Sequence, residues 1–242
     1  MSRTLIVTGG SRGIGRAIVS LAARRGWNVC FSYVSNAAQA DGLVAELGGA
    51  VRAVRADSAS EADTEALFAA CMSAFGPPDG LVNAAGIAGP SRPLVEQTAD
   101  EIDRVLAVNL RGPLLSCREM ARVARAHPGP ARAIVTIGSV AMRTGGLAGP
   151  VYPASKGGVA SMTLGMAREM AALDIRVTCL NPGLIDTDMT TSVTSAGTAA
   201  LVERIPLRRM GRAEEIAEAT LFLLSDAASY VTGTLLDVSG GR

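Results

Sequence analysis

Tyr152 and Lys156 stand four residues apart in the segment Tyr152-Pro153-Ala154-Ser155-Lys156. Side chains at this spacing share one face of a helix, and Pro153 suits a first helical turn. A free phenol loses its proton only near pH ~10, which makes it a poor proton shuttle at neutral pH. An ammonium one turn away stabilises the phenolate. The pair therefore predicts proton transfer at a substrate oxygen, with a surface contact at helical spacing as the plainer alternative.

Lys156 is also the only lysine of the chain, because all but one of the 23 basic residues are arginine. Coding bias towards arginine accounts for the missing lysines but not for the one that remains. A compact ammonium can donate to a ribose hydroxyl while it takes part in a proton relay, a task that a planar guanidinium performs poorly. The composition thus singles out Lys156 as a candidate functional residue.

Two more polar residues complete a candidate catalytic set. Ser139 follows an apolar run that ends in Ile137-Gly138, and its hydroxyl could hold a substrate oxygen beside the phenol. Asn109 closes an expected helix, and its amide could order a water that passes protons to Lys156. A strand-end cap is the alternative role for Ser139.

A glycine-rich turn, Thr8-Gly9-Gly10-Ser11-Arg12-Gly13-Ile14-Gly15, directly follows the first apolar run. Glycines allow a tight turn from strand to helix and a close approach of backbone N–H groups to a pyrophosphate, and the helix N-terminus adds favourable partial charge. The spacing differs from the G-x-G-x-x-G fingerprint, so a purely structural turn is the alternative. The residues expected to bind a dinucleotide here are Gly9, Ser11, Arg12, Gly13, Ile14 and Gly15.

Further cofactor contacts are expected where later strands end. Asp57-Ser58 follows the third apolar run, and its carboxylate could accept the adenine amino group. Asn83-Ala84-Ala85-Gly86 follows the fourth, and its small residues would let a cofactor lie flat across the sheet edge. Singly, each segment could equally be a plain exit from strand to loop. Together they line the crevice where open parallel sheets bind ligands.

The choice between the two nicotinamide cofactors is argued from charge. An NAD-selective site places an acid after the second strand to bind the ribose 2′-hydroxyl, whereas the segment from Phe31 to Asn36 holds none. Arg12, in the neighbouring turn, could pair with a 2′-phosphate. NADP(H) is therefore favoured over NAD(H), with a solvated loop charge as the alternative role for Arg12.

Short apolar runs alternate with amphipathic stretches almost from end to end, which predicts an α/β fold with a doubly wound parallel sheet of about seven strands and helices on both faces. The expected strands are Thr4–Thr8, Asn28–Tyr33, Val51–Ala56, Gly80–Asn83, Ala133–Gly138, Ile175–Leu180 and Thr234–Val238. The expected helices are Gly13–Arg25, Ala37–Leu47, Glu61–Phe75, Ala99–Asn109, Gly112–Arg125, Pro153–Leu173 and Ala213–Leu224. No linker divides residues 1–242, so one domain is expected. The longest stretch without an element, 182–196, is expected to be a functional loop.

Composition excludes several classes of protein. A net charge of +1 and 3% aromatic residues speak against a nucleic-acid-binding surface. The four cysteines lack a C-x-x-C pair, so buried reduced thiols are expected and no metal site. His127 lies in a Pro- and Gly-containing segment typical of a surface loop. No apolar run is long enough for a membrane span or a signal peptide, and a cytoplasmic location is expected.

The whole set of motifs resembles the short-chain dehydrogenase/reductase family. The resemblance is carried by Thr8-Gly9-x-x-x-Gly13-x-Gly15, Asp57, Asn83-x-Ala85-Gly86, Asn109, Ser139, Tyr152-x-x-x-Lys156 and Pro182-Gly183-x-x-x-Thr187. It implies a Rossmann-type sheet, a dimer or tetramer, and hydride transfer between the nicotinamide and a ketone, aldehyde or secondary alcohol. Tyr152 would be the general acid/base, Lys156 its activator and a ribose ligand, Ser139 the group that orients the carbonyl, and Asn109 the water holder.

The resemblance also assigns residues around the nicotinamide and shows one departure. Pro182, Gly183, Ile185 and Thr187 would belong to the loop that contacts the nicotinamide and its carboxamide. The family usually has Asn-Asn-Ala-Gly where this chain has Asn83-Ala84-Ala85-Gly86. The missing amide at Ala84 puts local support of the fourth strand in doubt but removes no proposed catalytic group.

Substrate and assembly remain open at this stage. The resemblance is to 3-oxoacyl carrier-protein reductases and to glucose-dehydrogenase-like members, and carrier-protein docking would need a basic patch, for which Arg118, Arg122, Arg125 and Arg132 are candidates. A modest ketone or sugar-like substrate is preferred, covered by segments 142–149 and 186–205. Met162, Met166 and Met170 are expected to pack inwards, while Gly158, Ala160, Ser161 and Gly165 would let a second subunit approach. A cofactor-binding regulatory protein on the same fold is the alternative from another class.

Overall fold

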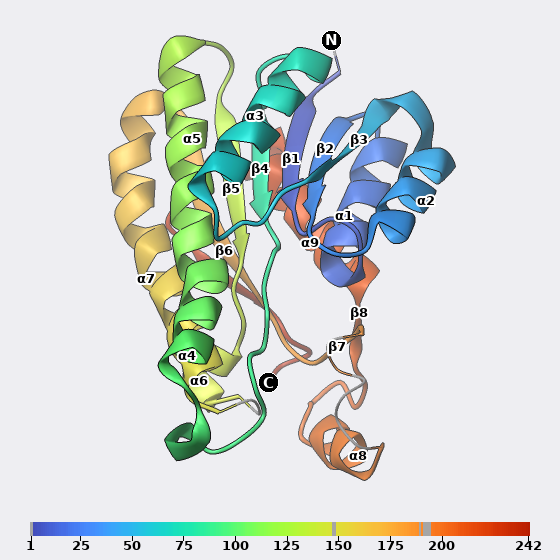
Figure 1. Ribbon diagram of the computed structural model, residues 1–242, viewed down its shortest axis with the longest axis vertical. Helices are drawn as coiled ribbons and strands as arrows, with labels where there is room; N and C mark the ends of the chain where they lie inside the picture. Colours follow the sequence, from blue (N-terminus) through green and yellow to red (C-terminus); the bar gives the residue numbers. More distant parts are fainter. Residues whose placement is uncertain (1, 147–148, 189, 191–194) are drawn as a thin grey trace.

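The short apolar runs form a seven-stranded parallel sheet in the order β3-β2-β1-β4-β5-β6-β9 (Figure 1). The structure is a computed structural model that describes residues 2–146, 149–188, 190 and 195–242. The strands are β1 (Thr4–Thr8), β2 (Asn28–Tyr33), β3 (Val51–Arg55), β4 (Gly80–Asn83), β5 (Arg132–Ile137), β6 (Ile175–Pro182) and β9 (Leu235–Val238). Each expected strand is present within two residues of its predicted ends. The predicted doubly wound α/β fold is therefore confirmed.

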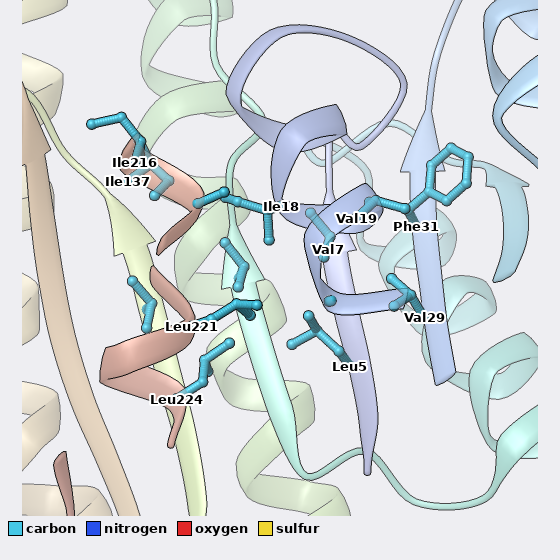
Figure 2. Packing of buried hydrophobic residues seen from close by; sticks show 14 of the residues in the cluster. Leu5, Val7, Ile18, Val19, Val29, Phe31, Ile137, Ile216, Leu221 and Leu224 are labelled. Atoms are coloured by element: carbon cyan, nitrogen blue, oxygen red, sulfur yellow. The ribbon is translucent and has the colours of Figure 1, made fainter. Parts of the chain in front are cut away.

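Helices cover both faces of this sheet, as β-α alternation requires. One face carries α1 (Gly13–Arg24), α2 (Ala37–Leu47) and α9 (Ala213–Leu224); the other carries α3 (Glu61–Phe75), α5 (Gly112–Ala126) and α7 (Val151–Met170), with α4 (Ala99–Leu106) leading into α5. Strand residues that alternate in direction feed the two cores: Leu5 and Val7 pack under α1 and α9, whereas Ile6 packs against the opposite helices. Figure 2 shows the first of these cores, where Ile18 of α1 lies towards Leu221 of α9 and Val19 lies towards Phe31 of β2.

The strand order places a topological switch between β1 and β4. From β1 the chain winds outwards through β2 to β3, then returns to pair β4 with the other side of β1, with Thr8 opposite Asn83. The loops after β1 and β4 therefore leave the sheet towards opposite faces, which opens a crevice at the carboxyl ends of these strands. Both the glycine-rich turn and the segment 84–86 lie at this crevice.

The helix expected to end at Asn109 does not end there. After α4, residues Ala107–Arg111 continue as a π-helical stretch that runs straight into α5. The prediction of two helices separated by residues 110–111 was wrong because the wider turn of a π-helix has no periodicity signal in the sequence. Such bulges are frequent at functional sites, and this one carries Asn109.

The expected loop 182–196 is partly ordered into elements that the sequence did not show. Ile185–Asp186 (β7) pairs with Gly211–Arg212 (β8), and Ser195–Glu203 forms α8, which lies apart from the sheet beside β7 and β8 (Figure 1). A second short helix, α6 (Ala141–Thr144), overlaps the start of the first expected substrate-covering segment. Both covering segments, 142–149 and 186–205, lie partly outside the described residues.

The structure also places the cysteines, His127 and the small residues and methionines of α7. Cys30, Cys71, Cys117 and Cys179 are buried free thiols, and His127 is exposed at the end of α5, as predicted. The three methionines of α7 do pack on the core. A Cβ on Gly158 would lie 2.8 Å from the Leu110 side chain, so this glycine serves packing within the chain. Ala160 is buried, whereas Ser161 and Gly165 are exposed.

No helix in the described part of the chain is both long and apolar enough to span a membrane.

Candidate active site

The glycine-rich turn is held tightly between β2 and the end of β4. Its Gly9 and Gly10 N–H groups donate to the Ser32 side chain and backbone oxygens at 3.1 and 2.9 Å. A Cβ on Gly9 would lie 2.8 Å from Ala85 Cα, and the backbone of Gly9 has a φ of +69° that favours glycine. The turn therefore crosses the switch point with backbone against backbone, as a close approach to a ligand requires.

The start of α1 is suited to an anion. Arg12 is its N-cap in extended conformation without a side-chain cap, and the first turn holds no acidic residue. The first N–H groups of a helix have no intrahelical acceptor, and together with the helix dipole they favour a phosphate. These residues fit the pyrophosphate of a dinucleotide.

The nicotinamide loop expected from the family lies over the same turn. A Cβ on Gly13 would meet only Thr187, at 3.6 Å, so the two segments face each other across the crevice. Gly183 packs against the backbone of Ser239, where a Cβ would lie 2.8 Å from Cα, and Ile185 is buried in β7. The Pro182 carbonyl accepts a hydrogen bond from Val140 N–H at 3.1 Å, which ties this loop to the segment after Ser139.

Gly15 offers a test of this packing. Its Cβ would lie 2.1 Å from the Gly9 carbonyl oxygen, so we expect Gly15→Ala to open the turn, to weaken cofactor binding and to lower the free energy of unfolding by about 1–3 kcal/mol. Gly42 in α2 has nothing within 4 Å of its Cβ position, so Gly42→Ala should raise stability by up to about 1 kcal/mol. Urea denaturation of both variants measures the difference. Equal stabilities would contradict the close approach.

Asp57, the expected adenine acceptor, already has protein partners. Its carboxylate accepts the Ala59 N–H at 2.9 Å and forms an ion pair with Arg104 of α4 at 2.8 Å. Partial burial opposes ionisation of Asp57, but the hydrogen bond from Ala59 and the Arg104 guanidinium outweigh it and hold the pKa below its usual range. Arg111 also donates to the Ala59 carbonyl. Asp57 is therefore not the free acceptor that was expected; an adenine amino group would share this carboxylate with Arg104.

Asn83 was placed among the cofactor contacts, but its side chain points into the protein. It is 2% exposed, accepts the Ser116 hydroxyl at 2.6 Å and donates to Thr136 Oγ1 at 3.2 Å. These bonds connect β4 to α5 and β5, so the local support of β4 is supplied without an amide at position 84. The N–H groups of Ala84 and Ala85 donate to Thr8 Oγ1, both at 3.2 Å. Small side chains, not polar atoms, are what this segment presents to the crevice.

Asn109 is fully buried, and its amide forms hydrogen bonds with other residues of the protein. Its Oδ1 accepts the Ile87 N–H at 2.9 Å, and its Nδ2 donates to the Ile87 carbonyl at 2.9 Å and to Ser155 Oγ at 3.1 Å. Both amide hydrogens are thus used, and Oδ1 keeps one lone pair. This oxygen lies near Gly86, where a Cβ would be 3.5 Å from Asn109 Oδ1 and 3.6 Å from Lys156 Nζ. The missing side chain of Gly86 brings the amide and the ammonium to one place.

Lys156 is buried, with 5% of its surface exposed. Its Nζ donates to the Ile137 carbonyl at 2.8 Å and lies 5.7 Å from the centroid of the Tyr152 ring. Across the described ranges, no carboxylate forms a salt bridge with it. A buried ammonium without a counter-charge is costly, and this cost falls when negative charge develops nearby.

Ser139 completes the cluster from the end of β5. Its Oγ accepts the Ala141 N–H at 3.1 Å, which leaves the hydroxyl proton directed elsewhere. The short helix α6 that follows packs against α7, so Ser139 and Tyr152 are carried by adjoining elements. The contacts of Gly86 thus place Asn109 and Lys156 beside the segment 84–86, and Ser139 precedes a helix that packs on α7, which carries Tyr152 and Lys156.

The start of α9 and the neighbouring β8 are held by charge. Glu215 at the start of α9 accepts both guanidinium nitrogens of Arg209 at 2.6 and 2.8 Å and the Arg212 N–H at 2.7 Å. The Arg209 and Arg212 donors lower the pKa of Glu215 to about 2. Glu215 therefore stays ionised across the physiological range and holds β8, and through it β7, in place beside the nicotinamide loop.

Several residues of the site escaped the sequence analysis. Ser155 joins Asn109 to the Tyr152 carbonyl, to which it donates at 2.7 Å. Arg104 pairs with Asp57, and Arg111 donates to the Ala59 carbonyl. Ser155 lies inside the Tyr-x-x-x-Lys segment, and this position could have marked it as a site residue. No sequence pattern marks the two arginines, because their partners are distant in the sequence. No group of three or more His, Cys, Asp or Glu side chains in the described part of the chain could hold a metal ion.

Comparison with known proteins identifies the family of this chain. A family model described as enoyl-(acyl carrier protein) reductase matches residues 9–242. The uncharacterized oxidoreductase YgfF of Escherichia coli is 42% identical over 243 residues, which cover 98% of each chain. The chain belongs to the short-chain dehydrogenase/reductase family.

Solved structures of this family have the same fold. The 3-ketoacyl-(acyl-carrier-protein) reductase from Brucella melitensis complexed with NADH is 33% identical, with a TM-score of 0.90 over 99% of this chain and 98% of the other. The blue fluorescent protein from a metagenomic library in complex with NADPH is 37% identical, also with a TM-score of 0.90, over 99% and 97%. This dehydrogenase/reductase is therefore an NAD(P)-dependent oxidoreductase that acts on alcohol or carbonyl groups of a small-molecule substrate.

Proposed function

We propose that this enzyme interconverts a ketone or aldehyde and the corresponding secondary or primary alcohol with NADP(H), using Ser139, Tyr152, Lys156 and Asn109. The observation that carries the proposal is the buried ammonium of Lys156, one turn from the Tyr152 phenol and without a carboxylate partner in the described residues. At effective dielectric constants inside a protein such a charge acts strongly on a neighbouring group.

Each residue has a distinct part. In the reducing direction Tyr152 gives its proton to the carbonyl oxygen, which Ser139 holds through its hydroxyl. Lys156 stabilises the phenolate that remains. The cofactor, when bound, supplies the hydride that reaches the carbonyl carbon, so that two electrons and one proton are accounted for.

The role of Asn109 is narrower than the sequence implied. Its amide holds the Ile87 backbone and Ser155, and the remaining lone pair of Oδ1 faces the space beside Gly86 and Lys156. A water in that space would have two polar partners, the minimum for an ordered site. Asn109 would then return protons to Lys156 through one water.

The preference for NADP(H) rests on charge at the ribose. Arg12 is exposed at the start of α1, and the segment after β2 holds no acid. A guanidinium pairs bidentately with a phosphate, which favours the 2′-phosphorylated cofactor. Relatives bind NADH and NADPH, so both are included in the test.

The charges on and near α5 bear on the choice between substrate classes. Docking of an acyl carrier protein was expected to need a basic patch on α5, but Arg118 and Arg122 pair with Glu61, Glu65 and Glu119, and Arg132 is buried against backbone carbonyls. Of the four arginines, two are thus paired with acids and one is buried, whereas Arg125 is exposed, so the attraction of this patch to an acidic partner is reduced. A small ketone or sugar-like substrate is the better proposal, with 3-oxoacyl thioesters as the alternative.

The same proposal covers organisation and location. Residues 1–242 would form one cofactor-binding domain. The exposed Ser161 and Gly165 on α7 would lie at a contact in a homodimer or homotetramer. Four buried free thiols fit a reducing, cytoplasmic setting.

A panel of ketones, sugars and 3-oxoacyl thioesters, each assayed with NADPH and NADH, tests the proposal. We expect turnover of small carbonyls, with a higher kcat/KM for NADPH. Cofactor binding without turnover across the whole panel would favour the regulatory alternative. Turnover confined to the thioesters would assign the enzyme to the carrier-protein reductases.

A further inference from the structure

An ion pair ties the short helix α6 to the edge of the sheet. Arg143 of α6, four residues after Ser139, donates through Nη2 to the Asp237 carboxylate of β9. In the sheet, β9 is separated from β5 by β6, so this contact spans the width of β6. The Val140 N–H also donates to the carbonyl of Pro182, the last residue of β6, at 3.1 Å. The segment that follows Ser139 is therefore fixed to the ends of β6 and β9.

The Asp237 carboxylate is itself held from within the sheet. Its register partner on β6 is Asn181, whose Nδ2 donates to Asp237 Oδ1 at 3.0 Å. Asn181 is fully buried, and its Oδ1 accepts the Cys179 thiol at 3.2 Å. Because both ends of this amide are bonded, the amide keeps one orientation, and the other carboxylate oxygen of Asp237 is left to Arg143.

The Asn181 amide also lies against the residue that precedes Ser139. A Cβ on Gly138 would lie 2.2 Å from Asn181 Oδ1, so a glycine is required where β5 meets this amide. Gly138 stands between Ile137, whose carbonyl accepts Lys156 Nζ at 2.8 Å, and Ser139. The amide and the ion pair are therefore in contact with the chain on both sides of Ser139, one before it and one after it.

We propose that Arg143 is a positioning residue for the reaction, which acts through Asp237 and Asn181 to hold the Ser139 hydroxyl at the substrate oxygen. The inference rests on the catalytic role of Ser139 proposed above. The side chains of Arg143 and Asp237 are 49% and 36% exposed, and ion pairs this exposed add little to the free energy of unfolding. A shift of about 1 Å at a reacting group, in contrast, can lower the rate about 100-fold. Loss of the pair should therefore affect turnover far more than stability.

Kinetics of Arg143→Met, with and without Ser139→Ala, test the proposal. We expect Arg143→Met to lower kcat for an accepted carbonyl about 10- to 100-fold, while the thermal unfolding transition and the Kd for the nicotinamide cofactor stay near wild type. In the Ser139→Ala enzyme the same exchange should change kcat less than about twofold, because the hydroxyl that Arg143 positions is absent. Arg143→Lys should restore most of kcat, because a single guanidinium nitrogen donates to Asp237.

Arg25→Met is the matched control. Arg25 pairs with Glu218 of α9, and the two side chains are 46% and 55% exposed, so this ion pair resembles that of Arg143 in its contact with solvent. It lies at the opposite ends of the strands, where α1 has ended and β2 is about to begin. We expect kcat of Arg25→Met to equal that of wild type.

The outcomes separate this proposal from the proposed function. A Ser139→Ala enzyme with wild-type kcat would overturn the catalytic set, and the positioning role with it. If Ser139→Ala is impaired, the positioning role alone is overturned by wild-type kcat in Arg143→Met, by the same loss with and without the Ser139 hydroxyl, or by an equal loss in Arg25→Met. If Ser139→Ala turns over too slowly for the comparison, Arg143→Lys decides, and a kcat as low as that of Arg143→Met overturns the positioning role.

Discussion

Replacing Lys156 with arginine is expected to remove most turnover while the protein still folds. The net charge of +1 is unchanged, but the ammonium occupies a site with 5% exposure and a 2.8 Å bond to the Ile137 carbonyl. A guanidinium is larger and planar, and it cannot place a compact charge beside both the Tyr152 ring and a ribose hydroxyl. We expect kcat/KM to fall roughly 100- to 10,000-fold, the range for loss of acid–base assistance.

Two further variants make this result interpretable. Lys156→Met keeps the stem without the charge, so a loss of activity in both variants with an intact thermal unfolding transition excludes simple overpacking. The reverse exchange at an exposed position of α5, Arg125→Lys, should leave activity unchanged because charge alone matters there. Near-normal activity of Lys156→Arg would show that the single lysine has no catalytic role and reflects composition alone.

Tyr152→Phe is expected to lower kcat by a similar factor, about 100- to 10,000-fold, with little change in cofactor affinity. Phenylalanine keeps the ring that lies 5.7 Å from Lys156 Nζ and removes only the hydroxyl. A group that acts in the transition state affects kcat and kcat/KM together, whereas KM stays nearly constant. Steady-state kinetics with an accepted carbonyl, together with NADP+ titration, separate these quantities.

Tyr230→Phe is the matched control, since this side chain is fully exposed and its hydroxyl has no part in the site. It should behave as wild type. A Tyr152→Phe enzyme that still oxidises NADPH at the normal rate with that carbonyl would refute the proton transfer and the role of Lys156 along with it.

What could be predicted from the sequence is what local chemistry dictates. Continuous apolar runs such as Leu5–Val7 are typical of strands covered on both faces, and their alternation with amphipathic helices restricts the topology to a doubly wound sheet. The glycines of the first turn are required because backbone approaches backbone there, as at Gly9 and Ala85. Tyr152 and Lys156 share a helix face by spacing alone. These features follow from neighbours in the chain, so the chain itself carries the signal.

Side-chain direction and partners could not be predicted, because they depend on contacts between distant segments. Asn83 ends a strand at the crevice, yet its side chain points to Ser116 and Thr136. Two of the four arginines expected to form a docking patch, Arg118 and Arg122, pair with acids on α3, and Arg104 pairs with Asp57 across the fold. The β7–β8 pair joins residues far apart with only two residues in each strand, too few for any period to show.

The sequence by itself determined the fold and the identity of the candidate reacting groups, since helix and strand periodicity and motif spacing are properties of the chain. The tertiary structure decided which polar atoms remain available. Both hydrogens of the Asn109 amide are bonded within the protein, and Asp57 is paired with Arg104. The single lysine is buried without a carboxylate partner among the described residues, and Arg55 donates to the backbone just after β2. Hydrogen bonds and charge pairs are satisfied between segments that only folding brings together.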